Sequence, residues 1–333
     1  MNNKALALFS GGLDSTLAIR VIQEQGIEVT ALNFMTPFCN CTNKSSGCKS
    51  EAKRVADELK VTVKIMNKGK DYLEVVRNPK FGYGKNMNPC VDCRIFMHKA
   101  AKEYMKEIGA SFIITGEVLG QRPMSQRRDT INIIDRESGL KGLVLRPLSA
   151  QLFPLTIPEE EGVVDREKLL KISGRSRKPQ MQLADDFKIK GYQCPAGGCL
   201  LTDVGFARRI KDLFKYSEDI NMLDVHMLKT GRHFRLNENT KLIVSRDESE
   251  GNKLNIYSGD RYTLLIPEGL PGPTSLIVGE PTDEIIDLAL RITAKYYKKG
   301  STDIKIKITH NDDSKVVDIT EHADDELIDS KII

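Results

Sequence analysis

A glycine-containing hexapeptide, Ser10-Gly11-Gly12-Leu13-Asp14-Ser15, follows a short apolar run near the start of the chain. Glycines let backbone N–H groups approach a phosphate closely, and the N-terminus of a following helix adds partial positive charge. The hydroxyl groups of Ser10 and Ser15 can donate hydrogen bonds to phosphate oxygens, and Asp14 can orient Mg²⁺ or cap the helix. The hexapeptide therefore predicts a phosphate-binding loop, with an ordinary N-capped glycine turn as the alternative. It lacks the Gly-Lys-Ser/Thr order of a Walker loop.

The chain has seven cysteines, an odd number that cannot all pair in disulfides. Their grouping favours metal binding or catalysis over a disulfide framework. The pair Cys90 and Cys93 is predicted to begin a helix, whose N-terminus lowers thiol pKa values, and two thiolates at this spacing can bind one metal ion or cluster. The other cysteines are Cys39, Cys41 and Cys48 after the second predicted strand, and Cys194 and Cys199 in the sequence CPAGGC.

Alternating strands and helices are predicted to position these residues. Strands are expected at 5–9, 27–34, 61–66, 111–115 and 143–145, and helices after the hexapeptide and at 50–59 and 91–108. Such alternation indicates a parallel sheet covered on both faces, with ligands at the carboxyl ends of the strands. Both the hexapeptide and Thr115-Gly116-Glu117 fall at such ends, so the sequence predicts a nucleotide site there.

The pattern changes near Pro147, and four segments are predicted. Residues 1–147 form the nucleotide-binding domain, and 148–204 form a mainly helical extension with helices at 167–172 and 179–187. Residues 205–310 form a smaller α+β domain with helices at 206–216 and 282–297 and strands at 242–245, 254–257 and 262–266. Residues 311–333 form an acidic tail.

The net charge of +4 combines a basic body with that acidic end, where eight acidic residues face two lysines. A positive body fits a polyanionic partner. The sequence has no apolar run of about 18 residues of the kind that spans a membrane, so a cytoplasmic location without a membrane partner is predicted.

Three motifs carry a resemblance to known families. The sequence SGGLDS after the first strand resembles the PP-loop of the ATP pyrophosphatase superfamily, and TGEVLGQRPMSQ at 115–126 is similar to a segment of the 4-thiouridine synthetase family of tRNA sulfurtransferases. The sequence NMNPCVDCR at 86–94 resembles a segment of both 4-thiouridine and 2-thiouridine enzymes. The resemblance covers about residues 4–200 and implies an α/β fold of the adenine nucleotide alpha hydrolase type, followed by the smaller α+β domain.

This resemblance implies that ATP is cleaved between its α- and β-phosphates and that AMP passes to a substrate oxygen. The implied nucleotide-binding residues are Ser10, Gly11, Gly12, Leu13, Asp14, Ser15, Asn33, Phe34, Thr115, Gly116 and Gln121. A TGE turn that merely caps the next helix, with Glu117 near its positive end, is the alternative. The N-terminal RNA-binding domain typical of 4-thiouridine enzymes has no counterpart before the PP-loop, so an RNA-docking surface is expected elsewhere.

Iron–sulfur-dependent members of the superfamily hold a [4Fe–4S] cluster with C-x2-C and one remote cysteine. The resemblance thus implies Cys90 and Cys93 as ligands, with either Cys194 or Cys199 as the third. A persulfide scheme with a nucleophilic and a resolving cysteine, structural zinc and inert thiols remain alternatives. The group at Cys39, Cys41 and Cys48 suits a metal as well as it suits ordinary loop thiols.

Clustered basic residues are predicted to hold RNA, because phosphate contacts set affinity more than sequence choice. For each cluster alone, a solvated surface is the alternative. The sequences GRHFRL at 231–236 and SRDESEGNKL at 245–254 resemble the RNA-binding module of NFACT proteins, where His233 and Phe234 either stack on a base or pack in the core. The predicted RNA-binding residues are Arg122, Arg127, Arg128, Arg175, Arg177, Lys178, Arg232 and Arg235.

Together these features predict ATP-dependent tRNA thiolation, with ATP and Mg²⁺ as cofactors and tRNA as the partner. A uridine carbonyl oxygen, at ring position 2 or 4, is adenylated, and sulfur then displaces AMP. The sulfur comes from sulfide or from a cysteine desulfurase or persulfide carrier, and the residues expected to carry the chemistry are Asp14, Cys90 and Cys93. The alternatives are a PP-loop ligase that amidates a small molecule and a non-catalytic RNA- or ribosome-binding adaptor.

Overall fold

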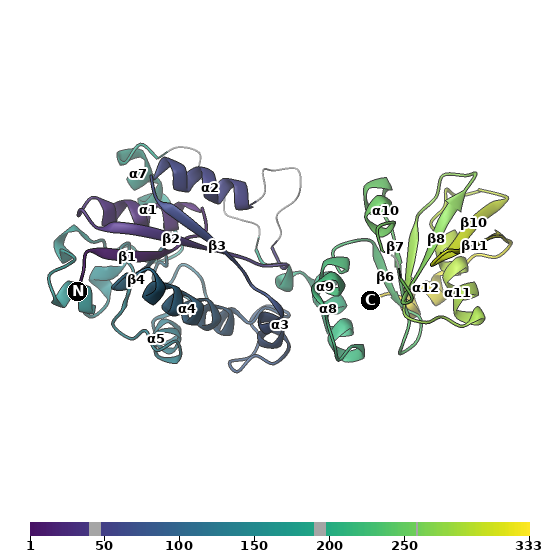
Figure 1. The fold of residues 1–333 in the computed structure, drawn as a ribbon, viewed down its shortest axis with the longest axis horizontal. Coiled ribbons are helices and arrows are strands. Elements are labelled where there is room, and N and C mark those ends of the chain that lie inside the picture. The colour runs from purple at the N-terminus through teal and green to yellow at the C-terminus, as the bar shows by residue number, and fades with distance from the viewer. Residues whose placement is uncertain (40–47, 190–197, 258) are drawn as a thin grey trace. The chain divides into compact units, whose positions relative to one another are not determined.

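The computed structural model describes residues 1–39, 48–189, 198–257 and 259–333, and only the backbone of residues 48–51. It divides into two compact units, Met1–Thr202 and Asp203–Ile333 (Figure 1). The predicted extension from residue 148 thus belongs to the same unit as the nucleotide-binding sheet up to Thr202.

Unit 1 is built on a parallel sheet in the strand order β3-β2-β1-β4-β5. The central strand β1 pairs with β2 on one side and β4 on the other, with Ala5 opposite both Val29 and Phe112. These strands are apolar runs because both faces of a parallel sheet are covered. The strands are β1 (Lys4–Leu8), β2 (Glu28–Met35), β3 (Thr62–Asn67), β4 (Phe112–Thr115) and β5 (Val144–Leu145).

Helices cover both faces of this sheet, as Figure 1 shows. Residues of α1, α2 and α7 share one apolar core with the sheet, and residues of α4 share the other. The helices are α1 (Leu13–Gln23), α2 (Cys48–Glu58), α3 (Lys70–Arg77), α4 (Cys90–Glu107), α5 (Arg128–Glu137), α6 (Ile157–Glu160) and α7 (Lys178–Asp186).

Unit 2 is built on an antiparallel sheet in the order β11-β10-β8-β9-β7-β6. Alternation along β7 divides its side chains between two cores: Leu242 and Val244 pack with α11 and α12, and Ile243 packs with Leu254 at the end of α10. The strands are β6 (Arg232–Arg235), β7 (Lys241–Val244), β8 (Tyr262–Glu268), β9 (Ser275–Val278), β10 (Ile304–His310) and β11 (Asp313–Ile319). The helices are α8 (Val204–Tyr216), α9 (Met222–Met227), α10 (Glu248–Leu254), α11 (Asp283–Ala294) and α12 (Asp325–Lys331).

The predicted fold class, a parallel α/β sheet followed by a smaller α+β unit, is confirmed. Two predicted elements are wrong. The helix expected at 167–172 is a 3₁₀ turn at Arg166–Lys168, because the chain then extends and Leu170 and Ile172 donate backbone hydrogen bonds to Pro147 and Leu148. The strand expected at 254–257 is replaced by the end of α10, which Asp247 caps by accepting from the Glu250 N–H.

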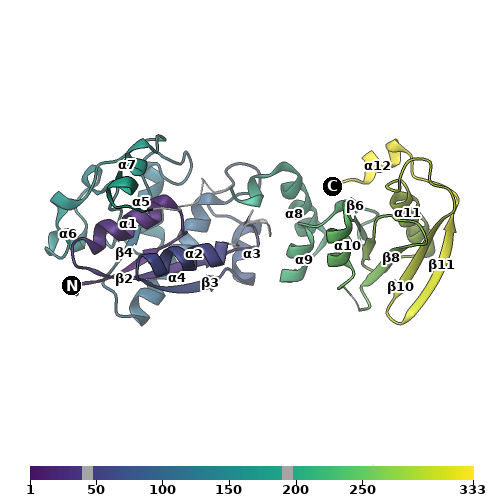
Figure 2. The same ribbon diagram turned by 90° about the horizontal axis from the view of Figure 1, so that it is seen from above.

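The acidic end of the chain is part of unit 2. Strand β11 pairs with β10 along its whole length, from Ile304 opposite Ile319 to His310 opposite Asp313, and Figure 2 shows the two as a long hairpin. Helix α12 follows, and Ile328 within it is buried against the unit 2 core. The acidic residues of 311–333 therefore lie largely on a paired strand and a packed helix. No helix in the described part of the chain is long and apolar enough to cross a membrane.

Candidate nucleotide and thiol site

The glycine hexapeptide lies between β1 and α1, at the carboxyl end of the central strand. Gly11 has a φ of 76°, and a Cβ there would come within 3.2 Å of the Ala52 Cα, so both conformation and space favour glycine. The Ser15 hydroxyl donates to the Gly12 carbonyl oxygen at 2.9 Å and accepts from the Ser10 N–H at 3.3 Å. These bonds close the turn and leave the N-terminus of α1 at the strand end, where it can bind an anion.

The segment after β4 packs directly against this turn. A Cβ on Gly116 would lie 2.4 Å from the Ser15 nitrogen and 2.5 Å from the Asp14 carbonyl carbon, so no larger residue fits without moving the backbone. The close approach depends on strand order, because β4 is the neighbour of β1 in the sheet. The predicted meeting of the two segments at one sheet edge is therefore observed.

A pocket of about 400 Å³ opens where the two segments meet. Asn33 and Phe34 do not line it, because the Asn33 amide donates to the Phe9 carbonyl oxygen at 2.8 Å and Phe34 packs against the core. Gly11 also lies outside the lining. The pocket is lined by Leu8, Ser10, Gly12, Leu13, Asp14, Ser15, Arg94, Thr115, Gly116, Glu117, Gln121, Arg122, Gln126, Arg175 and Arg177.

Asp14 offers this pocket a carboxylate oxygen. Its Oδ2 accepts a hydrogen bond from the Gln121 amide at 3.1 Å, whereas its Oδ1 is buried with no hydrogen-bond partner among the described residues. Burial raises the pKa of Asp14, although Gln121 and the charges of Arg177 and Arg122 act against this shift. A buried carboxylate oxygen without a donor suits a cation such as Mg²⁺.

Four arginines make the pocket strongly positive: Arg94, Arg122, Arg175 and Arg177. Burial and the neighbouring Arg94 lower the pKa of Arg122, which means that like charges are held close together. Such a cluster suits the phosphates of a nucleotide, since guanidinium groups bind phosphate oxygens in paired hydrogen bonds. Three of these arginines were predicted as RNA-binding residues, and the structure places them beside the phosphate loop.

The remaining basic residues predicted in unit 1 lie outside the pocket lining. Arg127 forms an exposed ion pair with Asp129 at 3.3 Å, and Arg128 donates to the Leu152 carbonyl oxygen at 2.8 Å. Lys178 is exposed at the first residue of α7. These three residues remain predictions as RNA contacts.

Arg94 and Glu117 are site residues that the motif analysis did not assign. The Glu117 carboxylate accepts from Arg146 Nε at 3.0 Å and lies 3.5 Å from Arg94 Nη1, while Arg146 also binds Asp135 at 2.8 Å. Burial opposes ionisation of Glu117, but the charges of Arg94 and Arg146 prevail and lower its pKa to about 2. Glu117 therefore holds Arg94 at the pocket. It does not cap a following helix, because the next helix, α5, begins only at Arg128.

Two thiols lie beside the pocket at the start of α4, where Cys90 is the first helical residue and Cys93 follows one turn later. Lys68 Nζ lies 3.0 Å from Cys93 Sγ. Burial raises the pKa of Cys93, but Lys68 and a hydrogen bond with Tyr72 outweigh burial and lower it. Burial and Cys93 raise the pKa of Cys90, against the charges of Arg94 and Arg122.

Cys199 approaches the same place from far along the chain. The backbone of Cys199 forms an isolated antiparallel β-bridge with the backbone of Cys39, and the two thiols do not form a disulfide. The Leu200 N–H donates to the Phe38 carbonyl oxygen at 2.9 Å. Burial raises the pKa of Cys199 to about 11. The pKa of the Tyr72 hydroxyl is raised by burial and then by Cys93, Cys199 and Cys90, so all three thiols lie near enough to act on this hydroxyl.

The described residues alone do not make a metal site. No group of three His, Cys, Asp or Glu side chains within 1–39, 52–189, 198–257 and 259–333 is arranged to hold a metal ion. Two of the predicted cysteines, Cys41 and Cys194, lie outside the described residues, as does the side chain of Cys48. The choice between Cys194 and Cys199 as a third ligand and the [4Fe–4S] cluster itself therefore stay predictions.

In unit 2 the residues of the sequence GRHFRL form β6 and are mostly engaged within the fold. His233 and Phe234 are buried, and the His233 ring nitrogen Nε2 lies 2.7 Å from the Thr230 carbonyl oxygen, so both pack in the core. Arg235 forms two hydrogen bonds with Asp212, at 3.0 and 2.5 Å. Arg232 stacks on Tyr296, with 4.6 Å between the guanidinium carbon and the ring centroid.

Two family models match the chain. Residues 1–151 match the model described as "Thiamine biosynthesis protein (ThiI)", and residues 231–330 match "NFACT protein RNA binding domain". These matches fall on the segments that carry the sequence resemblances.

Curated relatives match the N-terminal part. A tRNA-specific 2-thiouridylase of Leptospira interrogans is 31% identical over 183 residues, which cover 49% of this chain and 48% of the relative. A probable tRNA sulfurtransferase of Ureaplasma parvum is 29% identical over 156 residues, covering 45% of this chain and 37% of the relative. The chain thus spans about half the length, or less, of these curated relatives.

Two solved structures are also similar in part. A 4-thiouridine synthetase in complex with RNA and bound ATP shows 21% identity and a TM-score of 0.35, covering 56% of this chain and 51% of that one. The U34-tRNA thiolase NcsA of Methanococcus maripaludis with its [4Fe-4S] cluster shows 18% identity and a TM-score of 0.34, covering 68% and 81%.

Proposed function

Because residues 1–151 match the ThiI family model and residues 231–330 match the NFACT RNA-binding model, we propose that this chain is an ATP-dependent tRNA sulfurtransferase. One observation supports this proposal more than any other: two arginines that line the nucleotide pocket also lie near enough to act on a thiol. Arg94 and Arg122 line the pocket, and their charges also act on the thiol of Cys90. An activated substrate oxygen in the pocket would therefore lie beside a sulfur-bearing group.

In the first step ATP binds with its phosphates at the N-terminus of α1. Backbone N–H groups of the turn and the hydroxyls of Ser10 and Ser15 bind the phosphate oxygens, and the pocket arginines offset their charge. Asp14, whose Oδ1 has no hydrogen-bond partner among the described residues, would hold a Mg²⁺ ion, which would supply positive charge to the phosphates. A uridine carbonyl oxygen attacks the α-phosphorus, the bond between the α- and β-phosphates breaks, and pyrophosphate leaves. The uridine then carries AMP on its oxygen.

In the second step sulfur replaces that oxygen. A sulfide ion adds to the activated ring carbon, and the carbon–oxygen bond breaks to release AMP. If the sulfur arrives as a persulfide on one cysteine, the terminal sulfur attacks, and the second thiolate then attacks the carrier cysteine. That attack frees the thiouridine and leaves a Cys90–Cys93 disulfide for an external thiol to reduce. Lys68, 3.0 Å from the Cys93 sulfur, favours the thiolate that either route uses.

A bound [4Fe–4S] cluster would be held by Cys90 and Cys93 with either Cys194 or Cys199, and it would supply an iron that holds sulfide. A visible absorption spectrum after anaerobic purification tests for it. The characteristic broad absorption near 400 nm, lost when Cys90 and Cys93 are replaced by Ala, is expected if the cluster is present. If the protein is colourless and still forms thiouridine, the persulfide route is the one that remains.

Incubation with tRNA, ATP, Mg²⁺ and sulfide tests the proposed function. We expect equal amounts of AMP and pyrophosphate, and thiouridine in the nucleoside mass spectrum, whose fragmentation also gives the ring position. Asp14→Asn should lower turnover at least about 100-fold by removing the cation ligand. Asp129→Asn is the matched control, because this exposed carboxylate pairs with exposed Arg127 and accepts from the Thr130 hydroxyl, and it does not line the pocket.

Two experimental outcomes would favour one of the alternative functions over thiolation. AMP formation with ammonia and a small-molecule acceptor, unaffected by replacement of both Cys90 and Cys93 by Ala, would identify an amidating ligase. Tight tRNA binding without any ATP turnover would identify an adaptor.

A further inference from the structure

We propose that unit 2 contains a phosphate-binding subsite, formed by Arg235, Lys241 and Arg261, that takes one backbone phosphate of an RNA. The choice of RNA as the source of the phosphate rests on the proposed function. The subsite itself is a small pocket of about 80 Å³ that these three side chains line from β6, β7 and the residue just before β8.

The placement of two of these cations is unfavourable for folding alone. Arg235 and Lys241 are directly opposite each other in the antiparallel pairing of β6 and β7. Like charges at such positions destabilise a sheet. Lys241 is also only 7% exposed and precedes the apolar run of Leu242, Ile243 and Val244. An apolar residue at position 241 would satisfy the sheet better than a buried ammonium group.

The carboxylates nearby do not balance the three cations. Asp212 on α8 is occupied by the two hydrogen bonds from Arg235 and lies 3.8 Å from Lys241 Nζ. Asp224 on α9 pairs with Arg261 at 3.1 Å and accepts the N–H of Asn221. Three cations thus share two carboxylates, and one positive charge is left over.

The pKa of Lys241 reflects its burial first and its charged neighbours second. Burial lowers its pKa to about 7, and the charges of Arg235 and Arg209 add to that effect, while Asp212 and Asp224 oppose it. A bound anion would favour the protonated ammonium group. The subsite therefore lacks a negative charge that a phosphate would supply.

The shape of the pocket suits a phosphate group. Gly279, after β9, has a φ of 112°, and a Cβ there would lie 2.2 Å from the Asn239 carbonyl oxygen. Because residue 279 is a glycine, the backbone after β9 can lie close to the turn between β6 and β7. The glycine also places no side chain over the opening of the pocket. A volume of about 80 Å³ corresponds to roughly three water molecules. Tyr216 also lines the pocket, and Arg235 stacks on its ring at 4.5 Å.

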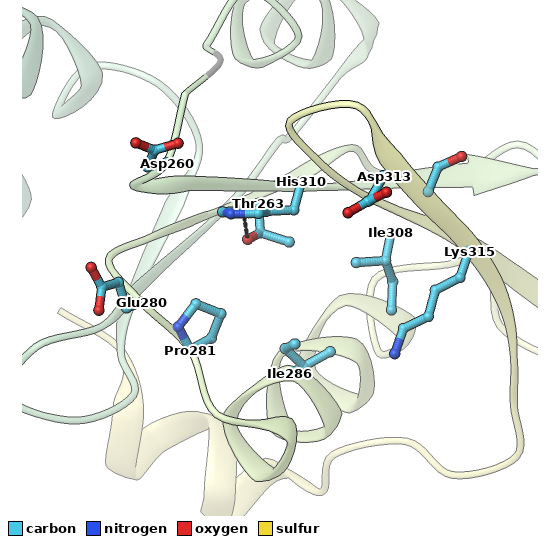
Figure 3. A pocket seen from close by; sticks show the side chains of 10 residues that line it. Asp260, Thr263, Glu280, Pro281, Ile286, Ile308, His310, Asp313 and Lys315 are labelled. Atoms are coloured by element: carbon cyan, nitrogen blue, oxygen red, sulfur yellow. Dashed lines mark hydrogen bonds between the residues drawn. The ribbon is translucent and has the colours of Figure 1, made fainter.

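A larger pocket of unit 2 has the opposite character. It has about 570 Å³ and is lined by Asp260, Glu280 and Asp313, with Lys315 as its one lysine or arginine. Figure 3 shows these carboxylates around the apolar side chains of Pro281, Ile286 and Ile308, with His310 hydrogen-bonded to Thr263 at 3.1 Å. Three carboxylates repel phosphate, so this pocket provides a control position.

Fluorescence anisotropy with the full chain and a labelled tRNA transcript, repeated over a range of KCl concentrations, tests the proposal. Lys241→Met and Arg261→Gln should each weaken binding about five- to tenfold at low salt and reduce the slope of log affinity against log salt by about one. Lys315→Met, the same change at the acidic pocket, should leave affinity and slope unchanged.

Wild-type affinity and slope for both Lys241→Met and Arg261→Gln would overturn the proposal. If Lys241→Met does not fold, Arg261→Gln decides, because the Arg261 side chain is 46% exposed and its loss leaves the core intact. Protection of Lys241 from acetylation by tRNA supports the assignment to RNA, whereas protection by inorganic phosphate alone would overturn it. Binding does not require ATP. If the chain forms no thiouridine but the two variants reduce the salt slope as expected, only the proposed function is overturned. If the chain forms thiouridine but the variants leave the salt slope unchanged, only this subsite is overturned.

Discussion

At the scale of single residues, the pocket depends on a charged side chain that buried ion pairs hold in place. Arg94 can face a nucleotide because buried Glu117 holds it, and Glu117 is in turn held by Arg146, which also pairs with Asp135. The motifs SGGLDS and TGEVLGQ predicted the residues that line the front of the pocket. The supporting pair could not be predicted, because Glu117 and Arg146 are 29 positions apart and meet only through the order of β4 and β5.

This ion network predicts an acid-sensitive fold. The pKa of Glu117 is about 2 in the folded chain against 4.5 for the free group, so the unfolded chain binds more protons between these values. The resulting stability is fully present above pH 4.5 and is lost as the pH falls toward 2, by about 3 kcal/mol. Urea unfolding followed by circular dichroism at several pH values measures it.

Glu117→Gln should flatten this pH dependence and destabilise the chain by about 3 kcal/mol or more at neutral pH, because buried Arg146 and partly buried Arg94 lose their shared partner. Glu103→Gln removes a carboxylate that is 70% exposed and should change neither quantity appreciably. A Glu117→Gln chain with the pH dependence of the wild type would show that another group carries the effect.

At the scale of elements, local sequence was informative wherever an apolar run and a glycine turn coincided. Strands β1 to β4 and helices α2, α4 and α7 lie within two residues of the predicted bounds. Errors arose where tertiary hydrogen bonds or caps decide the structure. Leu170 and Ile172 extend to bond with Pro147 and Leu148, and Asp247 starts a helix where apolar residues suggested a strand.

The contact between the end of β4 and the start of α1 gives an element-scale prediction. Gly116→Ala would place a methyl group 2.4 Å from the Ser15 nitrogen, so the phosphate turn must move. We expect at least about a tenfold loss of ATP affinity by calorimetry and a loss of about 1–3 kcal/mol in stability. Gly69→Ala is the control, since nothing lies within 4 Å of its Cβ and its φ is negative. ATP affinity equal to wild type in Gly116→Ala would separate this turn from nucleotide binding.

At the scale of the whole molecule, the chain joins a unit with a glycine turn and an arginine-lined pocket to a unit whose small pocket is lined by three basic side chains. The sequence predicted both fold classes and the change of pattern that precedes the second. It did not predict β6, β9, β10 and β11 as strands of one sheet, because their order follows from antiparallel pairing between distant segments. The same pairing creates the Arg235 and Lys241 neighbours that no linear motif reveals.

In the proposed reaction, AMP is transferred to a uridine oxygen, and the AMP that is released carries that oxygen. A tRNA transcript with ¹⁸O in the uracil carbonyls, incubated with the full chain, ATP and sulfide, tests this transfer by mass spectrometry of the released nucleotide. We predict one ¹⁸O atom in the AMP for each thiouridine formed. Release of ADP and phosphate, or of AMP without ¹⁸O, would contradict the account.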